Sequence, residues 1–183
     1  VDRRLKPIPP SGNVIRYQDI PERSKLGLIH ESYPQVVGVP VAPRPPEFFC
    51  QRYADELHDY FNRLPLNKEE VDRLLMPLIT QFVDLVNILP ASESHHHSGV
   101  CGLFAHSIQC ASAAVAVAER QLLGGGKSLR QRYQDRPRWL LAAGVMGLVH
   151  DVGKVFDVEV VTENGDKWNP FVCSLWAWVT QVN

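Results

Sequence analysis

Most of the histidines in this chain lie in one stretch, residues 95–154. Five of the seven are found there: His95, His96, His97, His106 and His150. The last of them is followed directly by Asp151. Imidazole nitrogens and a carboxylate oxygen are common ligands of zinc, iron, manganese and magnesium, and nitrogen favours the transition metals. The stretch therefore predicts a divalent-metal site, which we interpret as a site of metal-dependent phosphoester cleavage.

The pair His150-Asp151 comes at the end of the most apolar predicted helix. A carboxylate at that end faces the negative pole of the helix dipole, which disfavours its ionised form. A cation bound there reverses that penalty, whereas a structural role for the pair is the alternative. His106 alone is typical of a structural helix residue, but its combination with the pair favours a metal-ligand role.

Helical segments position these residues. Apolar residues recur at spacings of three and four over residues 47–64 and again over 67–89. Asn67 and Glu70 form a predicted capping box at the start of the second segment. Pro77, inside that segment, is expected to kink the helix.

A polar loop over residues 91–99 carries the histidine triplet and leads into a helix predicted over 101–123. The next helix is predicted from Pro137 to about His150, with Asp135 as its cap. Its apolar composition places it at the centre of the fold. Adjacent side chains of an extended segment point to opposite sides, so at most two histidines of the triplet face one site.

The end of the chain has a different pattern. Residues 154–168 alternate loosely around an asparagine-glycine pair at 164–165, which predicts a β-hairpin. Residues 169–182 are predicted to form a final helix. The fold class that follows is mainly α, a helical domain with a small C-terminal hairpin.

The first 46 residues form a separate region. They hold nine of the fourteen prolines. Proline fixes φ and lacks an N–H group, so regular helix is excluded over most of this region. Apolar residues such as Ile15 and Ile20 favour an arm that packs on the domain over a free linker. We therefore divide the chain into a proline-rich extended arm, 1–46, and a helical domain, 47–183.

The composition is that of a globular protein: 183 residues, 45% hydrophobic and 21% charged. A formal net charge of −1 excludes a global basic field that would attract nucleic acid. The four cysteines form no CxxC pair, which predicts reduced thiols and a cytoplasmic protein. Neither a signal peptide nor a membrane span is predicted, and the missing initiator methionine leads us to expect a fragment of a longer protein.

One local group of basic residues offers a candidate DNA contact. It consists of Lys127, Arg130, Arg132, Arg136 and Arg138. Phosphate binding by several such groups is sensitive to salt. Asp135 interrupts the run, and a solvated loop between helices is the alternative interpretation.

The combination of a helix histidine with a later His-Asp pair resembles the HD phosphohydrolase superfamily, and the resemblance implies an HD-domain-like helical bundle. The resemblance implies that His106, His150 and Asp151 bind metal, with Asp151 able to bridge two ions. It implies that Lys154, in the HDxGK form of the motif, neutralises a phosphate oxygen while a metal-bound hydroxide attacks phosphorus. A solvated lysine is the alternative for Lys154. The superfamily's distal aspartate has no clear counterpart, so either it lies beyond this sequence or a triplet histidine such as His97 replaces it.

The wider arrangement is similar to the relaxase domain of the mobilisation class H, the TraI type, of conjugative plasmids and integrating conjugative elements. The resemblance covers about residue 48 to the C-terminus. It rests on the motifs Leu89 to Ser92, His96-His97, Gly102-Leu103, His106-Ser107, His150 to Lys154 and Trp168 to Pro170. Cys101 departs from the family pattern, which has a glycine there.

This resemblance implies cleavage of one DNA strand at a transfer origin, the step that starts conjugation. It implies DNA and other conjugation proteins as partners and manganese, iron, magnesium or zinc as cofactor. His96, His97 and Lys154 are the expected catalytic residues, and His97 is also an expected metal ligand. Two other hypotheses stay open: a 3′-to-5′ exonuclease or phosphodiesterase of the HD superfamily, and an inactive DNA-docking module. No tyrosine is marked by a motif as a nucleophile.

Overall fold

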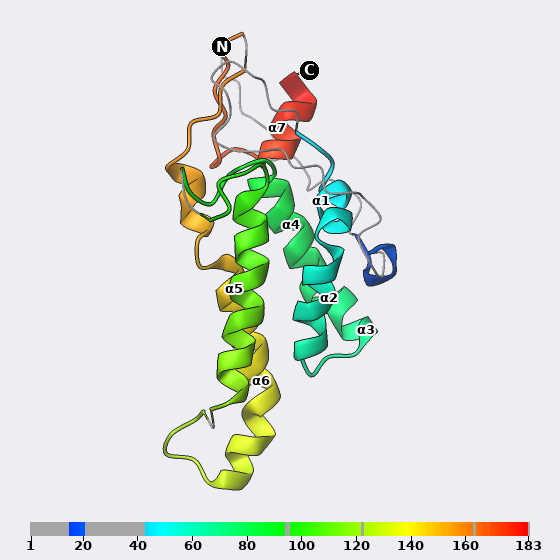
Figure 1. Cartoon of the computed structure of the whole chain (residues 1–183), viewed down its shortest axis with the longest axis vertical. Coiled ribbons are helices and arrows are strands. Elements are labelled where there is room, and N and C mark those ends of the chain that lie inside the picture. The colour runs from blue at the N-terminus through cyan, green and yellow to red at the C-terminus, as the bar shows by residue number, and fades with distance from the viewer. Residues whose placement is uncertain (1–14, 21–42, 94–95, 122, 163, 183) are drawn as a thin grey trace.

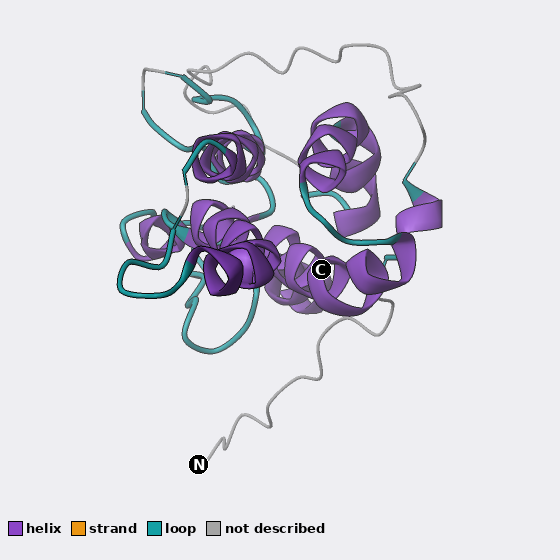
Figure 2. Ribbon diagram, turned by 90° about the horizontal axis from the view of Figure 1, so that it is seen from below, coloured by secondary structure: helices purple, strands orange, loops and turns teal. Residues whose placement is uncertain are grey.

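The chain is mainly helical (Figure 1). The computed structural model describes residues 15–20, 43–93, 96–121, 123–162 and 164–182. Its helices are α1 (Pro46–Arg52), α2 (Ala54–Arg63), α3 (Lys68–Glu70), α4 (Met76–Val86), α5 (Gly102–Glu119), α6 (Leu129–Val149) and α7 (Leu175–Val182). No β-strand occurs in these described ranges, as the ribbon of Figure 2 also shows. The predicted mainly α fold class is confirmed, whereas its assignment to an HD-type bundle stays a prediction.

Two long helices, α5 and α6, form an antiparallel pair that makes up the lower half of the molecule in Figure 1. Contact between these two helices is the most extensive between any two described elements. α2 packs against α5, and α4 packs against α1, α5 and α7. The shorter helices thus gather around the upper part of α5, the end that carries its histidine.

The core lies between α2, α4 and α5. Its largest fully buried side chains are Tyr60, Phe49, Phe104, Leu57, Leu75, Met76, Ile79, Leu89, Leu103, Ile108, Leu148 and Leu175. Burial of one such side chain contributes about 1.5–3 kcal/mol of transfer free energy. Because several of them flank His106 on α5, packing fixes the backbone that carries this histidine.

The helix predicted over residues 47–64 is present but divided into α1 and α2 at Tyr53. The predicted capping box after it is confirmed. Asn67 Oδ1 accepts a 2.9 Å hydrogen bond from the Glu70 amide, and Glu70 Oε2 accepts a 2.8 Å bond from the Asn67 amide. This signal is local, so it could be recognised in the sequence.

The expected kink at Pro77 takes the form of a π-helical turn, Val71–Leu75, directly before α4. In this wider turn the Met76 amide donates to the Val71 carbonyl, five residues back. A proline ring clashes with the carbonyl four residues before it and supplies no N–H group. The π turn accommodates both effects without ending the helix.

α6 is longer than predicted, and its predicted start was wrong. It begins at Leu129 instead of Pro137, and its cap is Ser128 instead of Asp135. Ser128 and Gln131 form a second capping box. Pro137 therefore lies inside the helix, where it removes one internal hydrogen bond without ending the helix.

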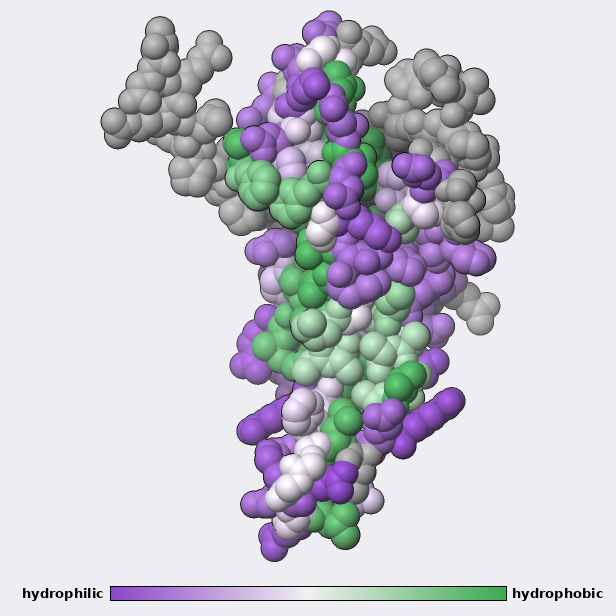
Figure 3. Space-filling model, turned by 90° about the vertical axis from the view of Figure 1, so that its left-hand side faces the viewer, coloured by the Kyte–Doolittle hydropathy of each residue, from purple (hydrophilic) through white to green (hydrophobic). Residues whose placement is uncertain are grey.

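The apolar composition of α6 predicted a central helix, but α6 is not central. Its buried residues are Leu140, Gly144 and Leu148, and Met146 is 64% exposed. In the lower half of Figure 3, formed by α5, α6 and their connection, apolar surface runs between hydrophilic margins. Packing gives α6 a buried face and an exposed face, although its sequence does not divide into an apolar and a polar face.

One membrane-span candidate occurs among the described residues, by length and composition alone: Leu129–Phe156, which is α6 with the 3-10 helix after it. The best window has a mean hydropathy of 1.3 and is 22% buried. The sequence predicted no membrane span because the apolar part of this helix alone is too short to cross a bilayer. Core helices of soluble proteins have similar length and composition, so this feature alone assigns α6 to neither class.

The predicted C-terminal hairpin does not form as strands in the part of the chain that the structure describes. Its first residues instead belong to the 3-10 helix Val152–Phe156, and an isolated antiparallel bridge joins Val161 to Lys167. The turn is at the predicted place, where Gly165 has φ 87°. A two-stranded hairpin without further strands is marginal, which explains why only the turn remains. The final helix begins at Leu175, later than predicted.

Most of the predicted arm lies outside the described residues, namely 1–14 and 21–42. Ile15 and Ile20 are buried in the core, and Tyr17 lies against Phe61 with ring centroids 5.6 Å apart. The Tyr17 amide also donates to Asp72. The division of the chain into an arm, 1–46, and a domain, 47–183, stays a prediction.

Candidate metal centre

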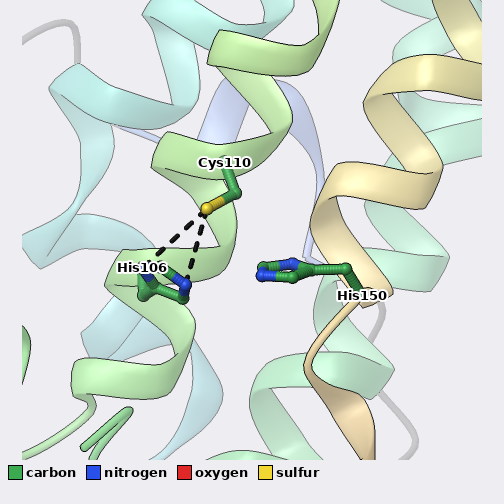
Figure 4. Close-up of side chains that lie close together, drawn as sticks. All are labelled: His106, Cys110 and His150. Atoms are coloured by element: carbon green, nitrogen blue, oxygen red, sulfur yellow. Dashed lines mark hydrogen bonds between the residues drawn. The ribbon is translucent and has the colours of Figure 1, made fainter.

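A cluster of metal-ligand side chains lies where the start of α5 meets the end of α6. His106 and Cys110 stand one turn apart on α5, and His150 follows the last residue of α6 (Figure 4). One ligand atom from each of these three residues lies within 4.8 Å of the other two. The His106 and His150 ring centroids are 5.2 Å apart. The two helices thus bring together histidines that are 44 positions apart in the sequence.

A close approach of the two helices makes this meeting possible. A Cβ atom added at Gly147 would lie 2.8 Å from the Ala111 Cα and 2.8 Å from the Cys110 carbonyl oxygen. Both neighbours are backbone and cannot move aside independently. Glycine at this position therefore sets the distance between α5 and α6 beside the cluster.

Asp151 lies between the two imidazoles. Its Oδ2 atom is 3.4 Å from His106 Nε2 and 3.4 Å from His150 Nε2. Ligand atoms about 2.0–2.2 Å from a tetrahedral zinc ion lie roughly 3.3–3.5 Å from one another. Both distances to the carboxylate oxygen are therefore those expected between ligands of one metal ion, and two imidazoles with a carboxylate are donors that suit a divalent transition metal.

A second contact orients His150. Its Nδ1 atom lies 2.8 Å from the Gly147 carbonyl oxygen, which can only accept a hydrogen bond. This assigns the proton of a neutral ring to Nδ1 and leaves the Nε2 lone pair facing Asp151. Metal-binding histidines commonly donate their other N–H group to such an acceptor.

Lys154 contacts the same aspartate. Its Nζ atom is 2.6 Å from Asp151 Oδ2 and donates to the Ala91 carbonyl oxygen at 2.9 Å. The lysine therefore ties the loop before α5 to the end of α6. Its charge lies at the cluster and not in bulk solvent, in contrast to the alternative of a solvated lysine.

The predicted ligands of the histidine triplet are placed differently. His97 lies beside the cluster, with its ring centroid 5.5 Å from that of His106. Its Nε2 atom, however, is 3.0 Å from Gln109 Oε1, and it is not one of the three grouped residues. His96 is exposed, and its carbonyl accepts a hydrogen bond from Ser92. His95 lies outside the described residues.

The loop of the triplet packs directly on the start of α5. A Cβ atom at Gly102 would lie 1.8 Å from the His97 carbonyl oxygen, so only glycine fits there. Cys101, the departure from the family pattern, has φ 60° and is fully buried. It adopts the left-handed conformation that favours glycine, so the tight turn is kept despite its side chain.

The charges of the cluster are strongly coupled. Burial lowers the pKa of His106, and His150, His97 and Lys154 lower it further, whereas Asp151 acts in the opposite direction. For Asp151, burial raises the pKa, but the Lys154 hydrogen bond and the neighbouring positive charges lower it by more. At neutral pH the site therefore presents a neutral imidazole beside an ionised carboxylate, the protonation states that bind a metal.

Cys110 is the member of the cluster that the sequence interpretation missed. Its Sγ atom is 3.5 Å from His106 Nε2 and 3.8 Å from His106 Nδ1. Burial raises the pKa of its thiol, and Asp151 raises it further. The signal was available, because residues four apart on a helix share a face.

The acidic residues Glu159 and Asp166, which follow Asp151 in the sequence, have partners of their own. Glu159 Oε1 pairs with Lys167 Nζ at 2.5 Å, and Asp166 accepts and donates hydrogen bonds with Thr162. Both belong to the C-terminal turn. Glu163 lies outside the described residues.

The predicted basic group is at the opposite end of the α5–α6 pair. Lys127 Nζ lies 2.5 Å from Asp135 Oδ2, and Arg138 lies 3.8 Å from the other oxygen of the same carboxylate. The Lys127 hydrogen bond lowers the pKa of Asp135, and the charges of Lys127 and Arg138 add to this effect. Asp135 thus neutralises part of the group.

Two more members of the basic group donate to backbone carbonyl groups, one at the end of α5 and one in the connection after it. Arg136 donates to the Glu119 carbonyl oxygen at 3.0 Å, and Arg132 Nε donates to the Leu123 carbonyl oxygen at 3.1 Å. Cationic groups near a helix C-terminus stabilise it. Arg130 is exposed on the first turn of α6. These contacts favour a structural role for the group over the predicted DNA contact.

Comparison with known families identifies the chain at the family level. The model of the TraI_2 family, described as “Putative helicase”, matches residues 40–183, which include the whole metal cluster. No curated protein and no solved structure is matched by the chain. The match covers well over half of the sequence. The chain therefore belongs to the TraI_2 family, a TraI-type family related to conjugative transfer.

Proposed function

We propose that this domain is an HD-type, metal-dependent DNA-cleaving domain of a conjugative relaxase, with a divalent metal ion held by His106, His150 and Asp151. Family membership supports a conjugation-related role in nucleic-acid processing. One observation carries the finer proposal. Two imidazole nitrogens from different helices approach one Asp151 oxygen, each at 3.4 Å.

Strand cleavage fits this segment better than a helicase motor. An ATP-driven motor needs a glycine-rich phosphate loop that follows a strand and opens a helix. The glycine-rich connection over residues 124–128 instead joins two helices, and its Lys127 pairs with Asp135. The metal cluster, by contrast, supplies what phosphodiester hydrolysis requires.

A bound metal ion supplies a Lewis acid and lowers the pKa of coordinated water. The protein positions the reacting groups around it. Gly147 orients His150, and Lys154 keeps a positive charge beside Asp151, where it is placed to neutralise a phosphate oxygen. We assign His97 a catalytic position next to the scissile phosphate, on the side of the loop before α5. His96 is a further catalytic residue of the same loop.

The proposed partners follow from this reaction. They are DNA at a transfer origin and other conjugation proteins, and the proposed location is the cytoplasm. The sequence of the origin is read by contacts that lie outside the cluster, because a metal and a phosphate carry no sequence information.

Metal analysis of the purified chain tests the proposal. We expect bound metal in the wild type and at least about a hundred-fold weaker binding in His106→Ala and Asp151→Asn, because each variant removes a direct ligand. Asp157→Asn is the matched control, since this aspartate is exposed and lies after the 3-10 helix. It should retain the metal.

Substrate assays then separate the hypotheses. A supercoiled plasmid with a transfer origin should be converted to the nicked form by the wild type and not by Asp151→Asn. Digestion of single-stranded ends without nicking would favour the exonuclease. DNA binding by a wild type that holds no metal would favour the docking module and contradict the proposal.

A further inference from the structure

We propose that Cys110 is a metal ligand of this site, and that its thiolate gives the site a preference for zinc and similar thiophilic ions over magnesium and manganese. The inference rests on the proposed metal function of His106, His150 and Asp151. It goes beyond that function because it adds a ligand of a different chemical class and names the group of metals selected.

Position is the first argument. Cys110 lies about one helical turn after His106, and Figure 4 shows its sulfur turned toward the His106 ring while the His150 ring extends toward α5 from the end of α6. The sulfur contacts both nitrogens of His106, at 3.5 and 3.8 Å. A thiol placed among metal-ligand nitrogens differs from one placed among hydrocarbon groups.

Distance is the second argument. A sulfur about 2.3 Å and a nitrogen about 2.0–2.1 Å from one tetrahedral zinc ion lie roughly 3.6 Å apart. The observed distance from Cys110 Sγ to His106 Nε2 is 3.5 Å. The ligand atoms of His106, Cys110 and His150 all lie within 4.8 Å of one another, so one ion can reach all three.

The other cysteines make the contrast clear. Cys50 and Cys101 are fully buried in the core, where a thiol acts as a small apolar side chain. Cys173 is partly exposed, but it is located in the C-terminal turn before α7. Of the four, Cys110 is the one grouped with two histidines.

The chemistry of binding is balanced. A divalent ion displaces the thiol proton, so that one metal–sulfur bond forms, one S–H bond breaks and one proton leaves to solvent. Soft thiolate selects zinc and other thiophilic ions, whereas magnesium and manganese prefer oxygen.

Cobalt(II) alone, titrated into the purified full chain, is the probe. A cobalt–thiolate bond gives a near-ultraviolet charge-transfer band, and tetrahedral cobalt gives visible bands whatever its ligands. We expect both bands in the wild type. Cys110→Val, which keeps a similar volume on α5, should lose the near-ultraviolet band and retain the visible ones. Cys173→Ser is the matched control and should retain both.

Competition experiments add a second measurement. The ratio of zinc affinity to manganese affinity should fall by about ten-fold or more in Cys110→Val. Visible bands without a thiolate band in the wild type would overturn the inference and leave the proposed metal function intact. A wild type that binds neither cobalt nor zinc overturns both. Circular dichroism of each variant shows whether the helices are retained.

Discussion

Each end of the α5–α6 pair carries cationic or imidazole side chains around one aspartate, but the two ends arrange these side chains differently. At one end, His106, His150 and Lys154 all face Asp151, and cationic or potentially cationic groups outnumber the carboxylate. At the other end, the basic residues of the connection and of the first half of α6 are divided among Asp135 and the carbonyl groups of Glu119 and Leu123.

The difference shows how to separate a functional cluster from a structural one. In the connection between the helices, each described contact satisfies a local need, such as capping a helix end. In the cluster, burial and the neighbouring positive charges lower the pKa of His106 while Asp151 acts in the opposite direction, and backbone packing at Gly147 keeps these groups together. One carboxylate shared by two imidazoles and a lysine is the arrangement on which the proposed metal site rests.

Gly147→Ala should have the largest effect. The added methyl group meets the α5 backbone at 2.8 Å, so the helices must separate beside the cluster. Overpacking of this kind costs about 1–3 kcal/mol of the free energy of unfolding. Metal affinity should fall with it. Denaturant unfolding and cobalt titration measure the two effects.

Gly125→Ala is its counterpart in the connection between the helices. No atom lies within 4 Å of a Cβ added there. Stability should change by less than about 0.5 kcal/mol, and metal affinity should not change. Equal losses in the two variants would contradict the role given to the close helix approach.

The two ends should also respond to different pH ranges. The pKa of His106 is lowered from 6.5, mainly by burial, so the unfolded chain takes up a proton below that value before the folded one does. Stability at the cluster should therefore decrease as pH falls through and below 6.5. The pKa of Asp135 is lowered from 3.8, mainly by the Lys127 hydrogen bond, so its contribution is lost only at still lower pH.

Hydrogen exchange at pH values between about 5 and 7 checks this order. Amides near His106 should lose protection first, while those around Asp135 stay protected. In His106→Gln the difference between the ends should shrink. Simultaneous loss at both ends would mean that the whole helix pair opens as one unit.

The DNA contribution of the basic group should be small. Arg130 and Arg138 are its most available members, because Arg132 and Arg136 donate to carbonyl groups and Lys127 pairs with Asp135. The double variant Arg130→Ala, Arg138→Ala should lower the slope of log affinity against log salt by at most about 2. Binding isotherms at several salt concentrations measure the slope. A larger change would show that this end is the main DNA surface.

A small gain in stability is expected between the two ends, at Tyr60. Its hydroxyl group is buried, has no hydrogen-bond partner among the described residues, and lies where a Cβ on Gly144 would be. Tyr60→Phe removes an unsatisfied polar group and should raise the free energy of unfolding by up to about 1 kcal/mol. Thermal unfolding would detect it. A clear loss of stability would show that the hydroxyl group has a partner.

Much of the fold could be predicted because its signals are local. The Asn67-Glu70 capping box and the helical segments of residues 47–64 and 67–89 follow from neighbours a few positions apart. The start of α6 was predicted wrongly because the sequence contains two competing start signals, Asp135-Pro137 and Ser128-Gln131. Packing of α6 along α5 favours the longer helix, and the energy of that packing cannot be read from a single sequence.

The candidate site could be predicted in kind but not in geometry. The residue types of His106, His150 and Asp151 indicated a metal, and the structure brings these three together. Lys154 also donates to the Ala91 carbonyl oxygen, 63 positions away in the sequence. No spacing rule predicts this contact. Cys110 was overlooked because a single thiol among histidines and a carboxylate did not match the ligand set of the resembled superfamily.

Gly147 has one further consequence. The same residue permits the helices to touch and provides the acceptor that aligns the His150 imidazole, so helix packing and the geometry of the proposed site depend on one position. A substitution that changes the packing there also changes the proposed site. Any attempt to engineer heat resistance into this domain should therefore leave that glycine unchanged and work elsewhere along the helices.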